Sequence, residues 1–215
     1  ERGVPMARIA KGEKTQKLGT RVSFLADTQI FSVTEMNFET LSQRLRALAF
    51  LNSGVLIEIR DERSEKKHEF RYEGGIVSFV KDINKAKTPL HDEPIFIRDE
   101  KDGEGVEIAL QWNEGYSENI FCFTNTIKNL DGGTHLIGFK AALTRTMNKS
   151  IDDSGILQKL KISIEADDIR EGLAAVCSVK VRDPKFSPQT TDKRGPSHVR
   201  PWVEQWVGAR LCQRL

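Results

Sequence analysis

The chain has 215 residues, of which 38% are hydrophobic and 30% are charged. This length allows one large domain or two small ones with a substantial core. No run approaches the ~18 consecutive apolar residues of a membrane span, and no signal-peptide pattern opens the chain, so we expect a soluble protein. Because the chain begins at Glu1 within a polar stretch, we also expect it to be a piece of a longer protein.

Charge is nearly balanced, because Lys and Arg total 33 while Asp and Glu total 31. No global field therefore drives binding to polyanions, although a local excess of basic residues in 180–215 suits an anionic partner. The three cysteines, Cys122, Cys177 and Cys212, are far apart and form no C-x-x-C pair. Their spacing predicts neither a disulfide framework nor a zinc site, and reduced thiols are typical of the cytoplasm.

The first part of the chain predicts a strand, a helix and a hairpin. Alternating residues in 20–24 ("TRVSF") indicate a strand. Asn37 is a candidate N-cap for a helix that ends near Gly54. The segments 55–60 and 67–72 flank a polar turn and predict a β-hairpin.

A short amphipathic helix and a linker come next. Apolar residues at helical spacing predict the helix over 76–83. The stretch 84–94 ("NKAKTPLHDEP") has the polarity and prolines of a linker, so we place a domain boundary near residue 88.

The second half is more regular. Three strands are predicted, at 94–98, 105–112 and 119–126. A helix is expected over 134–149, and the continuous apolar run 172–181 predicts an interior strand. Ser197 is a candidate cap for a last helix, in which Pro201 falls in the first turn. The whole is α+β, in two units.

Candidate catalytic and metal-binding residues are few. Asp167 and Asp168 are typical first-turn acids of a helix, and Asp152 and Asp153 lie in a polar connection. The four histidines include no pair at metal-ligand spacing, and His135 favours packing over ligand binding. No Ser/His/Asp or Cys/His arrangement can be assembled, so the residues predict neither a catalytic nor a metal site.

Three polar features have two interpretations each. The turn "DGGTH" (131–135) lies between a strand and a helix, where its backbone N–H groups could meet an anion. It lacks the spacing of nucleotide-binding motifs, which favours the other interpretation, a tight turn with positive φ. Lys140 and Arg145 flank the helix after it, and form either a solvated face or a surface facing DNA. The loop "SPQTTDK" (187–193) after the buried strand is either a solvated connection or a sensor of a charged ligand.

Several phrases follow one another in a fixed order: "YEGGI", "NKAKTPLH", "VEIALQWNEGYSENIFCFTNTI", "DGGTHLIGFKAALTRTMN", "DIREGLAAVCSVKVRDPKF" and "QT". This series, over about residues 1 to 195, closely resembles the B subunit of bacterial DNA gyrase, a type II topoisomerase. The related topoisomerase IV subunit departs more in the "QWNEGYSENI" stretch. The resemblance implies that 1–87 is the C-terminal portion of a GHKL-type ATPase domain, an α/β sandwich. It implies that 88–215 is a transducer domain with a left-handed β-α-β crossover.

The resemblance also assigns cofactor contacts, because the complete proteins of this family bind ATP and Mg²⁺. Thr20 would join the hydrogen-bond network at the adenine, and Val22 would line that pocket. Gln189 and Thr190 match the family's "QTK" loop, which meets the γ-phosphate.

The lysine of that loop is replaced here by Thr191, and Lys193 is the candidate substitute for its point charge on the phosphate. The family's catalytic glutamate, magnesium-binding asparagine, adenine-binding aspartate and Gly-rich lid correspond to positions before Glu1. We therefore expect this chain alone to be inactive and to bind no nucleotide or metal tightly.

The resemblance implies a cytoplasmic fragment of an ATP-dependent type II topoisomerase that changes DNA supercoiling, in which this segment couples ATP binding to gate closure. Its partners would be DNA, faced by Lys140 and Arg145, the A subunit of gyrase, and a second copy of the B subunit in an ATP-dependent homodimer. Two alternatives stay open: a non-catalytic interaction module with the transducer fold, and a fragment of the B subunit of topoisomerase IV.

Overall fold

The computed structural model describes residues 4–155, 159, 163–182, 184 and 199–212. The chain divides into two compact units, 1–41 and 42–215. None of the described helices is long and apolar enough to cross a membrane.

The first unit has little regular structure. A turn is present at Asp27, whose carbonyl oxygen accepts the N–H groups of Ile30 and Phe31. The strand predicted at 20–24 is wrong, because this backbone is irregular. A strand needs a neighbour for its backbone hydrogen bonds, and no strand among the described residues pairs with this segment.

A helix and a hairpin follow, as expected. Helix α1 (Phe38–Leu51) begins at the predicted cap, since the side-chain oxygen of Asn37 accepts the N–H of Thr40 at 2.9 Å. Strands β1 (Ile57–Asp61) and β2 (Lys66–Phe70) form a two-stranded antiparallel sheet.

A five-stranded mixed sheet forms the centre of the second unit, in the order β3-β4-β7-β5-β6. The strands are β3 (Ile95–Lys101), β4 (Glu104–Trp112), β5 (Asn119–Thr124), β6 (Ile127–Lys128) and β7 (Leu173–Lys180). Neighbours are antiparallel except for β5 and β7, which are parallel. All residues of β7 but the last are buried, which confirms the prediction of an interior strand.

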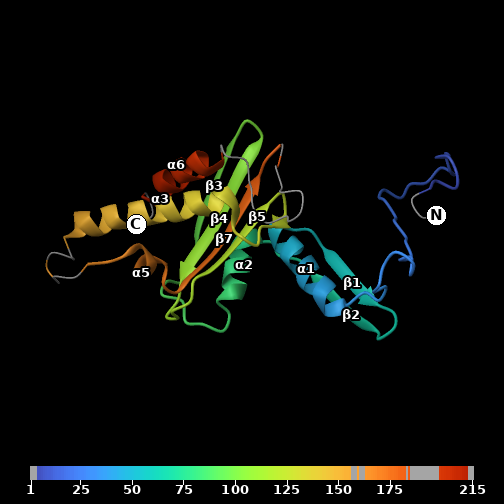
Figure 1. The fold of residues 1–215 in the computed structure, drawn as a ribbon, viewed down its shortest axis with the longest axis horizontal. Helices are drawn as coiled ribbons and strands as arrows, with labels where there is room; N and C mark the ends of the chain where they lie inside the picture. The colour runs from blue at the N-terminus through green and yellow to red at the C-terminus, as the bar shows by residue number, and fades with distance from the viewer. Residues whose placement is uncertain (1–3, 156–158, 160–162, 183, 185–198, 213–215) are drawn as a thin grey trace. The chain divides into compact units, whose positions relative to one another are not determined.

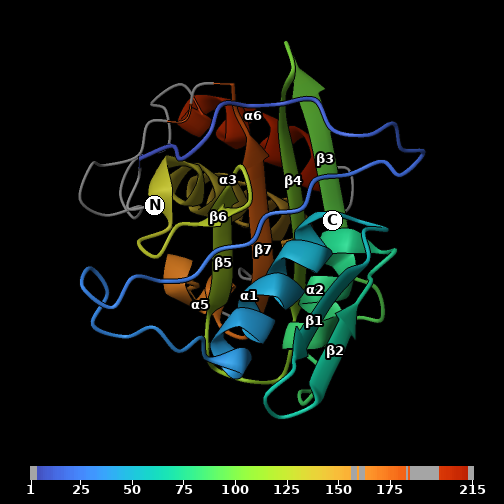
Figure 2. The same cartoon turned by 90° about the vertical axis from the view of Figure 1, so that its right-hand side faces the viewer.

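The connection between β5 and β7 has the uncommon hand. The chain runs from β5 through α3 (Gly133–Ser154) and α5 (Ala166–Arg170) to β7. In Figure 2 both strands point upward, β5 lies to the left of β7, and α3 lies behind the sheet. A connection that passes behind upward strands from left to right is left-handed, against the general preference. The expected left-handed crossover is therefore present.

Helices cover both faces of the sheet (Figure 1). Helix α2 (Gly75–Ile83) packs on one face against β4 and β7. Helices α3 and α6 (Val199–Leu211) cover the other face and pack on each other. Gly138 permits this approach, because a Cβ atom there would lie 2.6 Å from the carbonyl oxygen of Arg200. The core on this side includes Ile108, Leu110, Phe139, Leu143, Val203 and Val207.

The mixed α+β fold is confirmed, although one helix ends later in the chain than the sequence predicted. The helix expected over 134–149 continues to Ser154, where Gly155 ends it in the left-handed region at φ 65°. The predicted cap Ser197 lies outside the described residues.

The stretch 84–94, expected to be a linker, is held against β4. The N–H of Leu90 donates to the carbonyl oxygen of Trp112 at 2.9 Å, and the N–H of Glu114 donates to that of Thr88 at 3.0 Å. Pro89 also forms an isolated bridge with Asn113. The domain boundary near residue 88 stays a prediction.

Candidate functional site

The residues predicted to contact nucleotide are only partly described. Thr20 and Val22 lie in the first unit, where both are exposed. Gln189, Thr190 and Lys193 lie outside the described residues. The described part of the chain therefore does not assemble a nucleotide site from these positions, and their contacts stay a prediction.

Lys140 and Arg145 project from α3, and each is held by a carboxylate. Nζ of Lys140 lies 2.5 Å from Oε1 of Glu118, whose Oε2 accepts Nε of Arg170 at 3.1 Å. Nη1 of Arg145 lies 3.3 Å from Oε1 of Glu204. Because both cations are paired, a DNA phosphate would have to share them with these carboxylates or displace the carboxylates. Their role in facing DNA stays a prediction.

A buried network of side-chain amides joins α2 to β4. Nδ2 of Asn84, the residue after α2, donates to Oε1 of Gln111 at 2.9 Å. Nδ2 of Asn113 donates to Oδ1 of Asn84 at 3.1 Å and to the carbonyl oxygen of Gly172 at 2.6 Å. Nε2 of Gln111 donates to the carbonyl oxygen of His91 at 2.7 Å. The network thus connects the end of α2, the stretch 84–94, the end of β4 and the start of β7.

Sequence reasoning missed these amides. Asn84, Gln111 and Asn113 are 3%, 2% and 2% exposed, yet each stands in a segment whose polarity suggested a solvent-facing position. A buried amide is tolerated when its hydrogen-bonding groups find partners. Most of those partners are 20 to 59 residues away along the chain, so only the folded structure reveals them.

A second buried cluster lies between the sheet and α3. Cys122 and Cys177 are in-register partners on β5 and β7. A hydrogen bond with Cys177 lowers the pKa of the Cys122 thiol from 9.0 to about 6, burial opposes this shift, and the nearby His135 ring adds to it. Burial raises the pKa of Cys177 well above its ordinary value. The two thiols therefore titrate as one pair.

His135, on the first turn of α3, is 1% exposed. Although the ring lies close enough to Cys122 to lower its pKa, neither ring nitrogen makes a hydrogen bond of ordinary geometry with a described residue. Packing rather than ligand binding was expected here, and the burial agrees with it.

One of the carboxylates near α5 has a structural role as a helix cap. Oδ2 of Asp168 accepts the N–H of Glu165 at 2.7 Å and completes a capping box at the start of this helix. Within the described ranges, no three His, Cys, Asp or Glu side chains are grouped so that they could hold a metal ion. The expectation of no metal site itself stays a prediction.

Comparisons with known proteins place this chain in a family. The family described as DNA gyrase B matches residues 75–215. The B subunit of DNA gyrase from Myxococcus xanthus is 48% identical over 209 residues, which are 97% of this chain and 26% of that protein. The chain spans about a quarter to a half of the length of the first curated relatives, with 26% and 51% of them covered.

Solved structures agree with this result. The 43K ATPase domain of Thermus thermophilus gyrase B, solved in complex with an aminocoumarin, matches with a TM-score of 0.74 and 32% identity, over 88% of this chain and 51% of that one. The topoisomerase IV ATP-binding domain of Francisella tularensis, solved with a small-molecule inhibitor, matches with a TM-score of 0.71 and 25% identity, over the same shares of 88% and 51%. Because the family match covers well over half of the residues, including the sheet and the helices on both of its faces, the chain belongs to the DNA gyrase B family.

Proposed function

We propose that this chain is part of a DNA gyrase B protein that works with the A subunit of gyrase as an ATP-dependent type II topoisomerase and changes DNA supercoiling. The observation that carries the proposal is the family match over 75–215, which includes α2, the five-stranded sheet and the left-handed crossover. We assign 1–87 to the C-terminal portion of a GHKL ATPase domain and 88–215 to a transducer domain.

The segment would couple nucleotide binding to gate closure through β7. This strand lies in the middle of the sheet and ends at Lys180, shortly before the loop 187–193. Its start adjoins Gly172, which accepts a hydrogen bond from Asn113 of the amide network. A displacement of the loop would therefore act on a strand that is bonded to β4 and β5 along its length and tied to α2 at its far end.

Nucleotide contacts are proposed for the complete protein only. Thr20 and Val22 would lie at the adenine, and Gln189, Thr190 and Lys193 at the γ-phosphate. Bound ATP with Mg²⁺ would supply the free energy of hydrolysis to the cycle. This chain alone would bind neither of them tightly, and we expect calorimetric titration of it with a non-hydrolysable ATP analogue and Mg²⁺ to release no measurable heat.

The proposed partners, in the cytoplasm, are DNA, a second copy of the gyrase B protein and the A subunit of gyrase. Lys140 and Arg145 would contact DNA phosphates that share these cations with Glu118 and Glu204.

Changing either cation to Gln should lower DNA affinity and reduce the slope of log K against log salt concentration by about 1. Lys66→Gln on the β1–β2 hairpin is the matched control and should leave the slope unchanged.

The decisive experiment uses a complete gyrase B protein that contains this sequence, mixed with the A subunit of gyrase and relaxed plasmid. ATP-dependent negative supercoiling supports the proposal. Relaxation or decatenation without supercoiling would indicate a topoisomerase IV. No ATP-dependent activity, together with steeply salt-dependent DNA binding by this chain alone, would favour an interaction module.

A further inference from the structure

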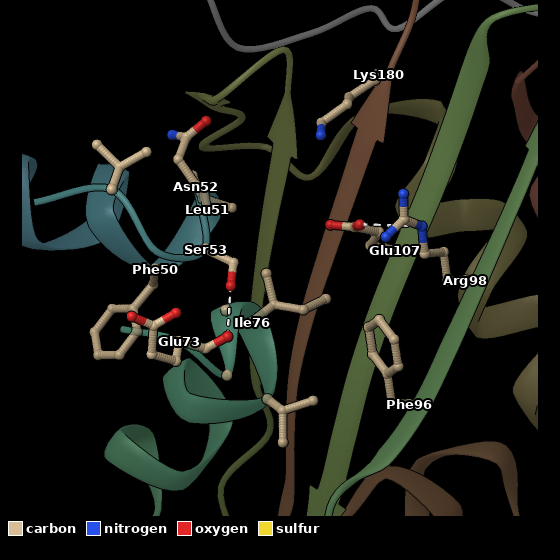
Figure 3. Close-up of a pocket in the computed structure, with 14 residues that line it drawn as sticks. Phe50, Leu51, Asn52, Ser53, Glu73, Ile76, Phe96, Arg98, Glu107 and Lys180 are labelled. Atoms are coloured by element: carbon tan, nitrogen blue, oxygen red, sulfur yellow. Dashed lines mark hydrogen bonds and ion pairs between the residues drawn. The ribbon is translucent and has the colours of Figure 1, made fainter. Parts of the chain in front are cut away.

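A cavity of about 510 Å³ opens on the face of the sheet that α2 covers. It lies between the end of α1, the start of α2 and strands β3, β4 and β7 (Figure 3). This volume is within the usual range for sites that bind small molecules.

One part of the cavity wall is apolar, and Phe96 is its solvent-exposed member among the residues named below. Phe50, Leu51 and Ile76 contribute from the helices, and Phe96 contributes from β3. Phe96 is 40% exposed, although its neighbour Ile97 on the opposite face of the strand is 2% exposed. A flat apolar group placed on Phe96 would therefore remove aromatic surface from water, which favours binding.

Charged side chains gather at the other end of the cavity. Figure 3 shows Lys180 and Glu107 pointing into it, with Arg98 beside Glu107. Nε of Arg98 lies 3.5 Å from Oε1 of Glu107, so these two charges largely offset each other. Lys180 has no ion-pair partner among the residues with described positions. Glu73 also lines the cavity, and its Oε1 lies 2.8 Å from Nε of Arg71. Lys180 is therefore the cation of this wall that no described carboxylate pairs with, and it stands next to the apolar part.

The backbone around Lys180 leaves room for a ligand group. Its cross-strand partner on β4 is Gly105, where the nearest described atom to an added Cβ would be 3.8 Å away. A second cavity, of about 260 Å³, lies here and shares Arg98, Glu107 and Lys180 with the first. The second cavity also has the carboxylates of Asp99 and Glu100 in its wall, which would repel an anion. An anionic group is therefore favoured on Lys180 from the side of the first cavity.

We propose that this cavity binds small organic monoanions that carry a flat apolar body, with the anion on Lys180 and the body against Phe96. The geometry matches a general feature of ligand sites, in which a few polar groups fix the orientation of a ligand that packs on apolar side chains. The inference does not rest on the proposed function, because it requires neither ATP nor DNA.

Naphthoate is a suitable probe, since it has an aromatic body and one carboxylate. We would titrate it into the isotope-labelled 215-residue chain and follow the backbone amide shifts. We expect saturable shifts at Gly74, Gly75 and Phe96. Lys180→Gln should weaken binding about ten-fold, the usual scale for a charge-assisted hydrogen bond. Naphthalenemethanol, which lacks the charge, should bind the unmodified chain about as weakly as naphthoate binds Lys180→Gln.

Lys101→Gln is the matched control, because Lys101 also ends a strand of this sheet but alternates onto the opposite face from Phe96 and Arg98. It should leave the affinity within about two-fold. Glu107→Gln should strengthen binding, since it removes a carboxylate that repels the bound anion and frees Arg98 from its ion pair. Phe96→Ala should weaken binding of both the anion and its neutral analogue.

Three results would overturn the proposal. One is equal affinity of the Lys180→Gln and unmodified chains for naphthoate. Another is a set of shifts confined to residues 4–41, where exposed Ile9, Leu18 and Leu25 offer unspecific apolar surface. The third is the absence of saturation up to the solubility limit of the probe.

Discussion

Nδ2 of Asn113 lies 3.1 Å from Oδ1 of Asn84, and this one hydrogen bond connects the end of β4 to the residue that follows α2. The same Nδ2 donates to Gly172, and Oδ1 of Asn113 accepts the N–H of Gly115 at 2.9 Å. The side chain of Asn113 therefore holds together three segments that are distant in the sequence.

Asn113→Ala should destabilise the chain by about 2 to 3 kcal/mol, because it leaves the buried Asn84 oxygen and the Gly172 carbonyl without this donor. Urea unfolding followed by circular dichroism measures the change as a lower midpoint. Asn119→Ala is the control, since the half-buried Asn119 side chain donates to the carbonyl oxygen of its near neighbour Ser117 at 3.1 Å. Equal midpoints for the two variants would show that the network contributes little.

A functional prediction for the same network rests on the proposed gyrase activity. In a complete gyrase B protein, Asn84→Ala should loosen α2 from β4 and leave the predicted nucleotide residues untouched. Supercoiling per ATP hydrolysed should fall by about two- to thirty-fold, the range of measured coupling energies, while ATPase activity stays near its original value. A parallel loss of both activities would point to general unfolding instead.

Gly172 meets a second constraint at this junction. Its φ is 70°, and a Cβ atom would lie 2.2 Å from the carbonyl oxygen of Asn113. Gly172→Ala should therefore cost more than about 3 kcal/mol, from strain and clash together. Gly155→Ala separates the two causes, because Gly155 has φ 65° and no described atom lies within 4 Å of an added Cβ. It should cost only about 1 to 2 kcal/mol. Thermal unfolding of both variants compares them.

The sheet and its helices follow from patterns that local sequence carries. The continuous apolar run of β7 predicted an interior strand, and it lies in the middle of the sheet. The predicted cap Asn37 acts through a bond within three residues, and Gly155, which the prediction missed by ending the helix at 149, also acts locally. Such signals can be read from sequence because both partners lie in one short window.

The wrong and missed predictions also have physical causes. Residues 20–24 alternate like a strand, but alternation cannot supply the neighbouring strand that a ladder requires. The stretch 84–94 has a linker's composition, yet its backbone is bonded to β4. Lys180 and Phe96 are far apart in the sequence and meet at one cavity only because β3, β4 and β7 are neighbours. Their relationship depends on topology, which no local pattern contains.

A pH-dependent contribution to stability is expected in the hairpin turn. Hydrogen bonds from the Arg63 side chain and backbone lower the pKa of Asp61 from 3.8 to about 2. Because the folded pKa is the lower one, this contribution is fully present above pH ~4 and is lost as the pH falls toward ~2. The carboxyl resonance of Asp61 should titrate near pH 2, and at a higher pH in Arg63→Gln, which removes the side-chain hydrogen bonds but keeps the backbone one. Identical titration in both chains would contradict this assignment.

His135 offers a test of why a polar ring lies in the core. Because neither ring nitrogen has a partner of ordinary geometry among the described residues, His135→Leu should remove a desolvation penalty and stabilise the chain by about 1 kcal/mol. Phe139→Leu, one turn further along the same buried face of α3, is the control and should destabilise it by about 1 kcal/mol or more through lost packing. Urea midpoints distinguish the two signs. If His135→Leu lowers the midpoint instead, the ring must have a hydrogen-bonded partner in solution, and the Cys122 thiol beside it is the first group to examine, by repeating the measurement in Cys122→Ala.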